Sequence, residues 1–438
     1  MNSQLAIERR RLGTLVGVSM TAAVFAAACS NESGAIQEGG AESPAGAEAT
    51  SDVIGGNDAG PGTEAPQEAA GPQARLVATY DGGLMTLDAD TLEVLDTTEM
   101  PGFLRVNPAG DGRNVFVSTP EGFRVYDAGT WSEPHGDHSH SYVQSPALTD
   151  TVYSAEEPGH VVAHEGKTVL FSDGDGRMQT VTTEDMRDGD YPEPETAVAD
   201  EPHHGVAVAL PGGSVLMTTG DADSRNGAKV IDANHAEVAS TEECPGVHGE
   251  APAAGGRIAL GCEDGIVVWD GERFTKIDAP DAYGRIGNQK GSEDSAVVLG
   301  DYKVDPDAEL ERPERISLTN TETGTMRLVD LGTSYSFRSL ERGPGGEALI
   351  LGTDGALHVI DPDSGVETDA VEVIDEWREP AEWQEARPTV FTMGETVYVS
   401  EPEKKLLHEV DLASGEVTQT ALLPHAPNEL TGVSGDID

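Results

Sequence analysis

Basic residues are scarce in this sequence of 438 residues. Lys and Arg number 27 against 79 Asp and Glu, so the formal net charge is −52. A field of this sign repels nucleic acid and anionic membrane surfaces, attracts cations and keeps a protein soluble. We therefore expect no nucleic-acid partner. Most of the carboxylates are expected to form a generally acidic surface.

Aromatic residues make up only 5 % of the chain, so a core must be built from the aliphatic part of its 37 % hydrophobic residues. The apolar run 12–28 is too short for a comfortable membrane span. It follows Arg9, Arg10 and Arg11 and ends at Cys29, as in a signal peptide. Export by the general or the twin-arginine route is open. We assign residues 1–28 to this signal.

Ala26-Ala27-Ala28-Cys29 resembles a lipobox, in which the cysteine carries the lipid of the mature protein. The alternative is ordinary cleavage that leaves a free thiol. Residues 29–73 comprise this Cys29 and an acidic linker of Gly, Ala, Glu, Pro and Ser, whose composition cannot bury enough apolar surface to fold. The prediction is an exported, cell-envelope protein, anchored by lipid to the outer face of the cytoplasmic membrane.

Long stretches of helical periodicity are absent from residues 74–438, which we assign to one folded domain. Short aliphatic runs recur instead, 39 to 54 residues apart, and most lie between turn sequences. They begin at Leu76, Val115, Val169, Val215, Ile258, Val297, Leu349 and Val397. This pattern predicts an all-β protein, a β-propeller of eight blades, with seven as the alternative. The run Leu430-Thr431-Gly432-Val433 is expected to pair with the strand at Leu76 and close the ring.

Cysteine is also scarce, with three in the chain. Cys244 and Cys262 bracket a predicted hairpin that turns at Ala253-Ala254-Gly255, and folding there places them opposite each other. Export permits a disulfide between them. The alternative is a pair of thiolates that contributes to a metal site.

Several catalytic motifs are missing. The sequence has no Gly-x-Ser-x-Gly elbow, no P-loop and no loop with EF-hand spacing. Acidic pairs such as Asp173 and Asp175 lie between predicted strands, where Asp commonly forms turns.

Histidine, by contrast, is concentrated. His135, Asp137, His138 and His140 fall within six residues, and imidazole and carboxylate are ligands of borderline divalent metals. Small residues between them predict a flexible loop that can close round an ion. The alternative is a solvated polar loop that happens to be rich in histidine.

The propeller pattern brings other histidines together. The first strand of each blade lines the central channel, and those of three consecutive blades should begin near His160, His204 and His248. His203 and Glu250, their neighbours in sequence, are further candidate ligands. The prediction is a metal site at the channel mouth, with affinity that falls as the pH drops through the histidine range near 6.5.

Several segments resemble those of AztD-type zinc metallochaperones. They are His135-Gly136-Asp137-His138-Ser139-His140, Pro158-Gly159-His160-Val161-Val162, His203-His204-Gly205-Val206-Ala207-Val208, Cys244-Pro245-Gly246-Val247-His248-Gly249-Glu250-Ala251, Gly284-Arg285-Ile286-Gly287-Asn288-Gln289 and Leu299-Gly300-Asp301-Tyr302-Lys303. The resemblance implies an exported propeller that binds Zn2+ without catalysis and passes it to the solute-binding protein of an ABC-type zinc importer. We expect a monomer, with the channel histidines as the holding site and the His135–His140 segment for capture or hand-off.

Two other functions stay open at this point. One is a secreted metal-dependent hydrolase or lyase that uses the channel histidines as ligands and Glu250 or Glu201 as base, because a catalytic zinc also keeps an open position. The other is a protein-interaction propeller with incidental histidines.

Overall fold

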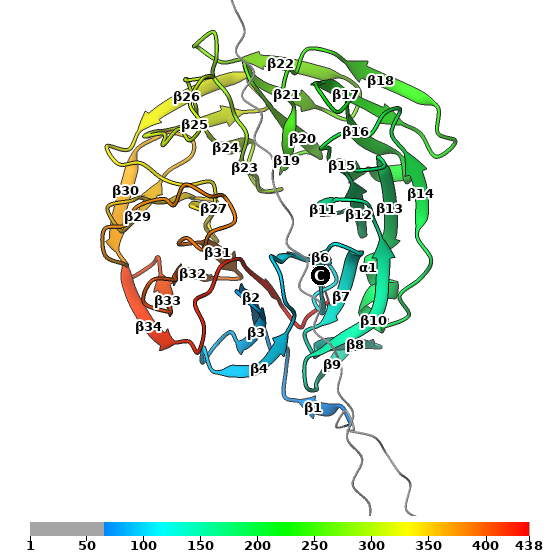
Figure 1. The fold of residues 1–438 in the computed structure, drawn as a ribbon, viewed down its shortest axis with the longest axis vertical. Coiled ribbons are helices and arrows are strands. Elements are labelled where there is room, and N and C mark those ends of the chain that lie inside the picture. Colours follow the sequence, from blue (N-terminus) through cyan, green and yellow to red (C-terminus); the bar gives the residue numbers. More distant parts are fainter. Residues whose placement is uncertain (1–64, 438) are drawn as a thin grey trace, which may run out of the picture. The chain divides into compact units, whose positions relative to one another are not determined.

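The computed structural model describes residues 65–437. The signal peptide, Cys29 and most of the predicted linker lie outside these residues. Within the described part, eight four-stranded antiparallel sheets follow one another round a ring (Figure 1). The predicted all-β propeller class is confirmed. We interpret each four-stranded sheet as one blade.

Within each sheet the strands run in order from the inside of the ring outward. The first four sheets are β35, β2, β3 and β4 (Leu430–Val433, Arg75–Tyr80, Gly83–Asp88, Val94–Glu99); β5, β6, β7 and β10 (Arg105–Pro108, Asn114–Thr119, Gly122–Asp127, Ala147–Ser154); β11 to β14 (Pro158–His164, Lys167–Ser172, Arg177–Thr182, Glu195–Val198); and β15 to β18 (Ala207–Ala209, Val215–Gly220, Arg225–Ile231, Glu237–Thr241). The other four are β19 to β22 (His248–Ala253, Arg257–Cys262, Gly265–Trp269, Phe274–Asp278); β23 to β26 (Gln289–Lys290, Val297–Asp301, Arg315–Asn320, Thr325–Asp330); β27 to β30 (Leu340–Arg342, Ala348–Leu351, Ala356–Ile360, Glu367–Glu372); and β31 to β34 (Val390–Met393, Thr396–Glu401, Leu406–Asp411, Glu416–Leu422).

Helices are minor. In residues 65–437 they are the short α1 (Thr183–Asp188) and one 3-10 turn, Pro211–Gly213. No helix in this part of the chain has the length and apolar character needed to cross a membrane.

The ring closes through the C-terminal strand. β35 pairs antiparallel with β2, with Val433 opposite Arg75 and Leu430 opposite Ala78, as the sequence predicts. Closure removes the exposed edges that an open sheet would present.

The core lies between neighbouring sheets, because alternate side chains of a strand point to opposite faces. Ile258 and Leu260 of β20 pack in one apolar cluster with residues of the preceding sheet, whereas Ala259 packs in the next cluster with Ile286 and Tyr302. The outermost strands have one exposed face, as the alternating burial of β4 shows.

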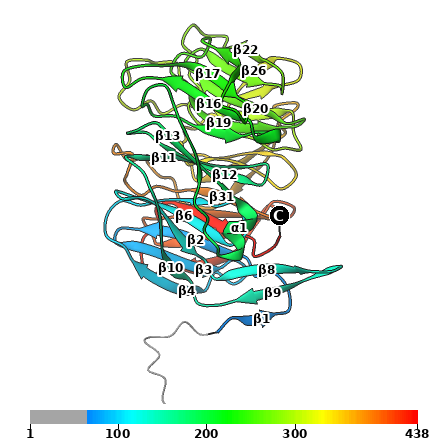
Figure 2. The ribbon, with the colours of Figure 1, turned by 90° about the vertical axis from the view of Figure 1, so that its right-hand side faces the viewer.

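A three-stranded sheet is attached to the second blade. The hairpin of β8 (Thr130–His135) and β9 (His138–Val143) is inserted between β7 and β10, and the short β1 (Gln67–Ala69) pairs with β9. Figure 2 shows the hairpin projecting from the ring with β1 along its edge. This corrects the expected boundary at residue 73, because residues 67–69 belong to a folded sheet and not to the linker.

Candidate metal centres

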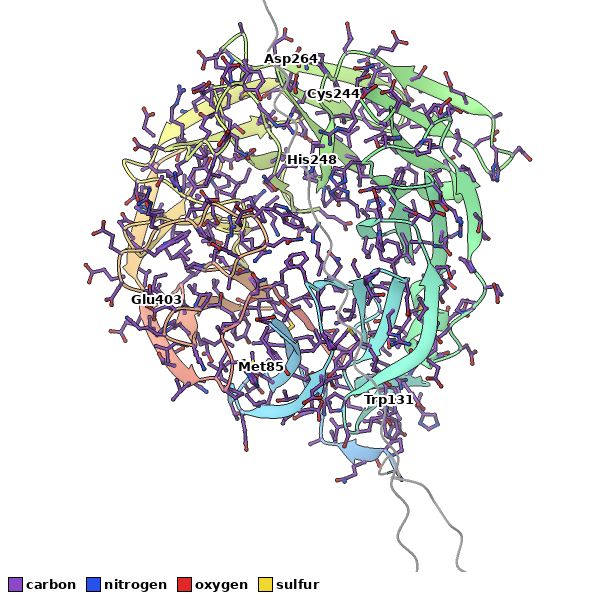
Figure 3. The ribbon with its side chains drawn as sticks, in the orientation of Figure 1. Met85, Trp131, Cys244, His248, Asp264 and Glu403 are labelled. Carbon is purple, nitrogen blue, oxygen red and sulfur yellow. A yellow bond between two sulfur atoms is a disulfide. The ribbon has the colours of Figure 1, made fainter. Side chains whose placement is uncertain are left out.

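Three histidines from consecutive sheets meet at one end of the inner strands. His160 lies on β11, His204 in the segment before β15, and His248 begins β19. One nitrogen atom of each lies within 4.8 Å of the other two, and the Nε2 atoms of His204 and His248 are 3.1 Å apart. Figure 3 shows His248 at the inside of the ring. We refer to these three residues as the channel triad.

The remote nitrogen atom of each ring is fixed. The Nδ1 atoms of His160 and His248 bond to the carbonyl oxygens of Gly205 (2.9 Å) and Gly287 (2.5 Å). A carbonyl oxygen can only accept, so each Nδ1 carries the proton and each Nε2 presents a lone pair. This is how ligating histidines are held in metalloproteins.

His204 is oriented by a carboxylate instead. Its Nδ1 donates to Oδ2 of Asp173 at 2.5 Å, and the mostly buried Asp173 also accepts from the backbone N–H of Gly205. Sequence reasoning assigned Asp173 to a turn and missed this contact. The sequence could have indicated this contact, because Asp173 directly follows β12. The second strand of a blade ends on the same face of the propeller on which the inner strands begin, and the channel triad lies on that face.

Glycines next to the histidines make room for this arrangement. A Cβ on Gly159 would overlap Oδ1 of Asp173, which a real side chain could not tolerate. Gly249 has a φ of +66°, beside the irregular pairing between His248 and Ala251. These backbones place His160 and His248 at the mouth of the channel.

Burial keeps two of the three rings neutral. Loss of solvent, followed by the neighbouring histidines, lowers the pKa of His160 to about 3. The same two causes, burial first and then His204, lower the pKa of His248 to about 3. Both imidazoles are thus ready to bind a metal at neutral pH without losing a proton.

Two predicted ligands are not part of the channel triad. His203 is buried, and its ring bonds to the carbonyl of Glu201 through Nδ1 and to the hydroxyl of Thr218 through Nε2. Both ring nitrogens of His203 therefore already have hydrogen-bond partners. His203 points away from His204 because successive residues of an extended segment point to opposite sides. The carboxylate of Glu250 is also outside the group, and burial raises its pKa to about 7.

A second cluster lies on the hairpin and consists of His135, His138 and His140, which we call the hairpin triad. His135 pairs with His138 across the turn, and His140 is two residues further along β9, so all three point to one face. The segment predicted as a flexible loop is thus an ordered two-residue hairpin turn, with Gly136 at a φ of +68°.

The hairpin triad has the spacing of a tetrahedral zinc site. The distances among Nδ1 of His135, Nε2 of His138 and Nε2 of His140 are 3.3, 3.2 and 3.3 Å. Tetrahedral Zn–N bonds of about 2.0–2.1 Å put ligand nitrogens about 3.3–3.4 Å apart. Asp137 is not one of the three, but its exposed carboxylate accepts from Nδ1 of His138 at 3.2 Å.

The hairpin is held to the ring on its other face. The hydroxyl of Ser132 contacts that of Ser141 at 2.9 Å and donates to the carbonyl of Gly435 at 2.7 Å. At the base of the hairpin, on the same face as the triad, Trp131 stacks on Tyr142 and receives the guanidinium of Arg113 over its ring. Trp131, labelled in Figure 3, marks this base.

The predicted disulfide is present, but the predicted pairing was wrong. Cys244 and Cys262 are bonded, with Cα atoms 5.0 Å apart. In the ladder, however, it is His248 that pairs with Gly261, and Cys244 lies before β19 begins. The difference begins at the turn, because Ala253 lies opposite Arg257 and the hairpin therefore turns at residues 254–256. The segment before β19 returns Cys244 to Cys262.

No protein-family model matches the chain. It is 26 % identical over 372 residues to the zinc chaperone AztD of Citrobacter koseri, covering 82 % of this chain and 86 % of the relative. Two crystal structures of Citrobacter koseri AztD, one of them the apo form, superpose with TM-scores of 0.71 and 0.70 at 24 % and 23 % identity, covering 83 % of this chain and 98 % of each structure. The resemblance drawn from the sequence motifs is confirmed, and the solved structures establish the fold.

Proposed function

We propose that this protein is a zinc metallochaperone that binds Zn2+ outside the cytoplasmic membrane and transfers it to the solute-binding protein of an ABC-type zinc importer. The observation that carries the proposal is the channel triad, in which three imidazoles converge while each remote nitrogen is fixed by an acceptor. The relative named a zinc chaperone supports the same metal and a role without catalysis.

The two triads suit different tasks. We assign the holding site to His160, His204 and His248, because backbone carbonyls and Asp173 hold their rings. Three protein ligands leave one position open on a tetrahedral zinc, as a site that must hand on its ion requires.

We assign capture or hand-off to the hairpin triad on its projecting hairpin, where His135 and His138 are exposed and His140 is partly exposed. Each 1.4 kcal/mol of binding slows escape about tenfold at a fixed association rate, so a tightly held ion cannot be passed on by simple dissociation. An accessible second set of imidazoles offers ligands that exchange during docking.

The proposal includes export and a lipid anchor at Cys29, as expected from the sequence. A disulfide such as Cys244–Cys262 persists in oxidising compartments outside the cytoplasm, which supports this location.

The test is zinc binding by the purified mature protein, measured by competition with a chromophoric chelator. Joint replacement His204→Ala and His248→Ala should abolish tight binding at the channel while circular dichroism shows an intact fold. Normal tight binding by a variant that also lacks the hairpin triad would refute the placement.

His164 offers a matched control. It lies four residues after His160 on β11, and its Nδ1 bonds to the carbonyl of Ala209 at 2.7 Å just as His160 bonds to Gly205. It is not part of a metal-binding group among the described residues. His164→Ala should therefore leave zinc affinity unchanged, whereas His160→Ala should reduce it.

A further inference from the structure

The hairpin triad is connected to a segment about 70 residues earlier in the chain. β1 pairs antiparallel with β9, with Glu68 opposite Tyr142 and Ala69 opposite Ser141. Because side chains alternate along a strand, Glu68 lies on the same face as His140. Its Oε1 accepts a hydrogen bond from Nδ1 of His140 at 2.7 Å.

This contact is on the side of His140 that faces away from the other two histidines. Nε2 of His140 points toward His138 and His135, at 3.2 and 3.3 Å, and Glu68 holds the opposite nitrogen. A carboxylate in that position fixes the ring orientation and makes the ligating nitrogen more basic. Glu68 is thus a positioning residue and not a ligand.

Another carboxylate is near but has a different partner. Glu133 of β8 pairs with His140 across the hairpin, yet its Oε1 accepts from Nε1 of Trp131 at 3.0 Å. The bond to His140 therefore comes from β1 and not from the hairpin itself.

Resting on the proposed binding of zinc at the hairpin triad, we propose that strand β1 is a clasp: Glu68 raises the zinc affinity of the hairpin triad, and bound zinc in turn holds β1 against β9. The two effects are linked, because any coupling between two binding events is reciprocal. β1 has three residues, two of them exposed, so its own pairing has little stability. Detachment of β1 then weakens the hairpin triad and favours hand-off.

The experiment uses mature protein with His204→Ala and His248→Ala, so that zinc binding reports the hairpin. Second-layer partners of metal-bound histidines typically contribute 10- to 100-fold in affinity, and we expect the low end because Glu68 is exposed. Glu68→Gln should weaken zinc binding about tenfold. The matched variant Glu133→Gln should change it less than twofold.

A second readout distinguishes coupling from a loss of local structure. In the parent, zinc should slow hydrogen exchange at the amides of residues 67–69, and in Glu68→Gln it should not. The proposal for β1 is overturned if the parent and Glu68→Gln bind zinc equally tightly, or if zinc does not change hydrogen exchange of residues 67–69 in the parent. Neither result would affect the channel site or the proposed function. Absence of zinc binding by the protein with both triads intact overturns the proposed function as well.

Discussion

Asp173 gives the sharpest test of the channel triad, because among residues 65–437 it is the carboxylate that bonds to a histidine of this triad. Its Oδ2 accepts from Nδ1 of His204 at 2.5 Å. Hydrogen bonds to charged groups contribute about 1.5–3 kcal/mol, about twice the contribution of neutral ones. Asp173→Asn keeps an acceptor oxygen but loses the charge, so about 1.4 kcal/mol should be lost, which is a tenfold weaker site.

The replacement Asp173→Ala should be worse. It removes the acceptor for His204 and also that for the backbone N–H of Gly205, at 3.3 Å. His204 is then free to rotate away, and we expect a loss toward 100-fold, the upper end for such partners.

The measurement is chelator competition at pH 7 in protein whose hairpin triad is replaced by alanine, so that only the channel binds. Asp175 supplies the control. It lies in the same turn, and it bonds to the backbone and side chain of Arg177. Asp175→Asn removes a similar charge without touching the triad. Equal affinities of the two asparagine variants would refute the role given to Asp173.

Three further outcomes are expected. Because burial lowers the pKa values of His160 and His248 to about 3, zinc affinity between pH 6 and 5 should fall much less than the roughly 500-fold expected of three ordinary imidazoles; a slope approaching three protons would contradict this. Thiol titration of denatured, unreduced protein should find neither Cys244 nor Cys262 free, and loss of the bridge should cost near the low end of about 2–5 kcal/mol, since its loop is short; a free thiol in stoichiometric amount would count against it. In stopped-flow transfer to the cognate solute-binding protein, replacing the hairpin triad with alanine should slow transfer while overall equilibrium affinity changes little; a collapse of affinity would make the hairpin part of the holding site.

The repeat was predictable from sequence because each second strand is a short aliphatic run buried on both faces. All eight predicted runs fall in such strands, and β35 closes the ring against β2 as expected. That spacing also brought His160, His204 and His248 together, although 44 residues separate each from the next. The spacing of the repeats predicts this convergence because the first strand of every blade begins at the same end of the channel.

The periodicity of the sequence does not predict which way a side chain points or which distant residue it contacts, and the other features of the two sites depend on both. His203 and His204 are adjacent, and only the structure shows that the first is bonded to Thr218 and the second to Asp173. Glu68 lay in a segment whose composition is that of a linker, and its pairing with β9 depends on a hairpin inserted in another blade. The predicted register at Cys244 was wrong because the hairpin turns at residues 254–256, with Ala253 opposite Arg257, and a displaced turn shifts every pair of the hairpin.

The distribution of carboxylates argues for what the protein selects. The chain has 79 of them, and an acidic surface attracts Ca2+ and Mg2+ as readily as Zn2+. Yet in the described residues the converging atoms of both triads are imidazole nitrogens, and the carboxylates of Asp173 and Glu68 bond to the remote nitrogens of these rings. Oxygen-seeking cations gain little from imidazole, whereas zinc binds it well. An acidic surface can thus concentrate cations in general, while converging imidazole nitrogens favour zinc among them.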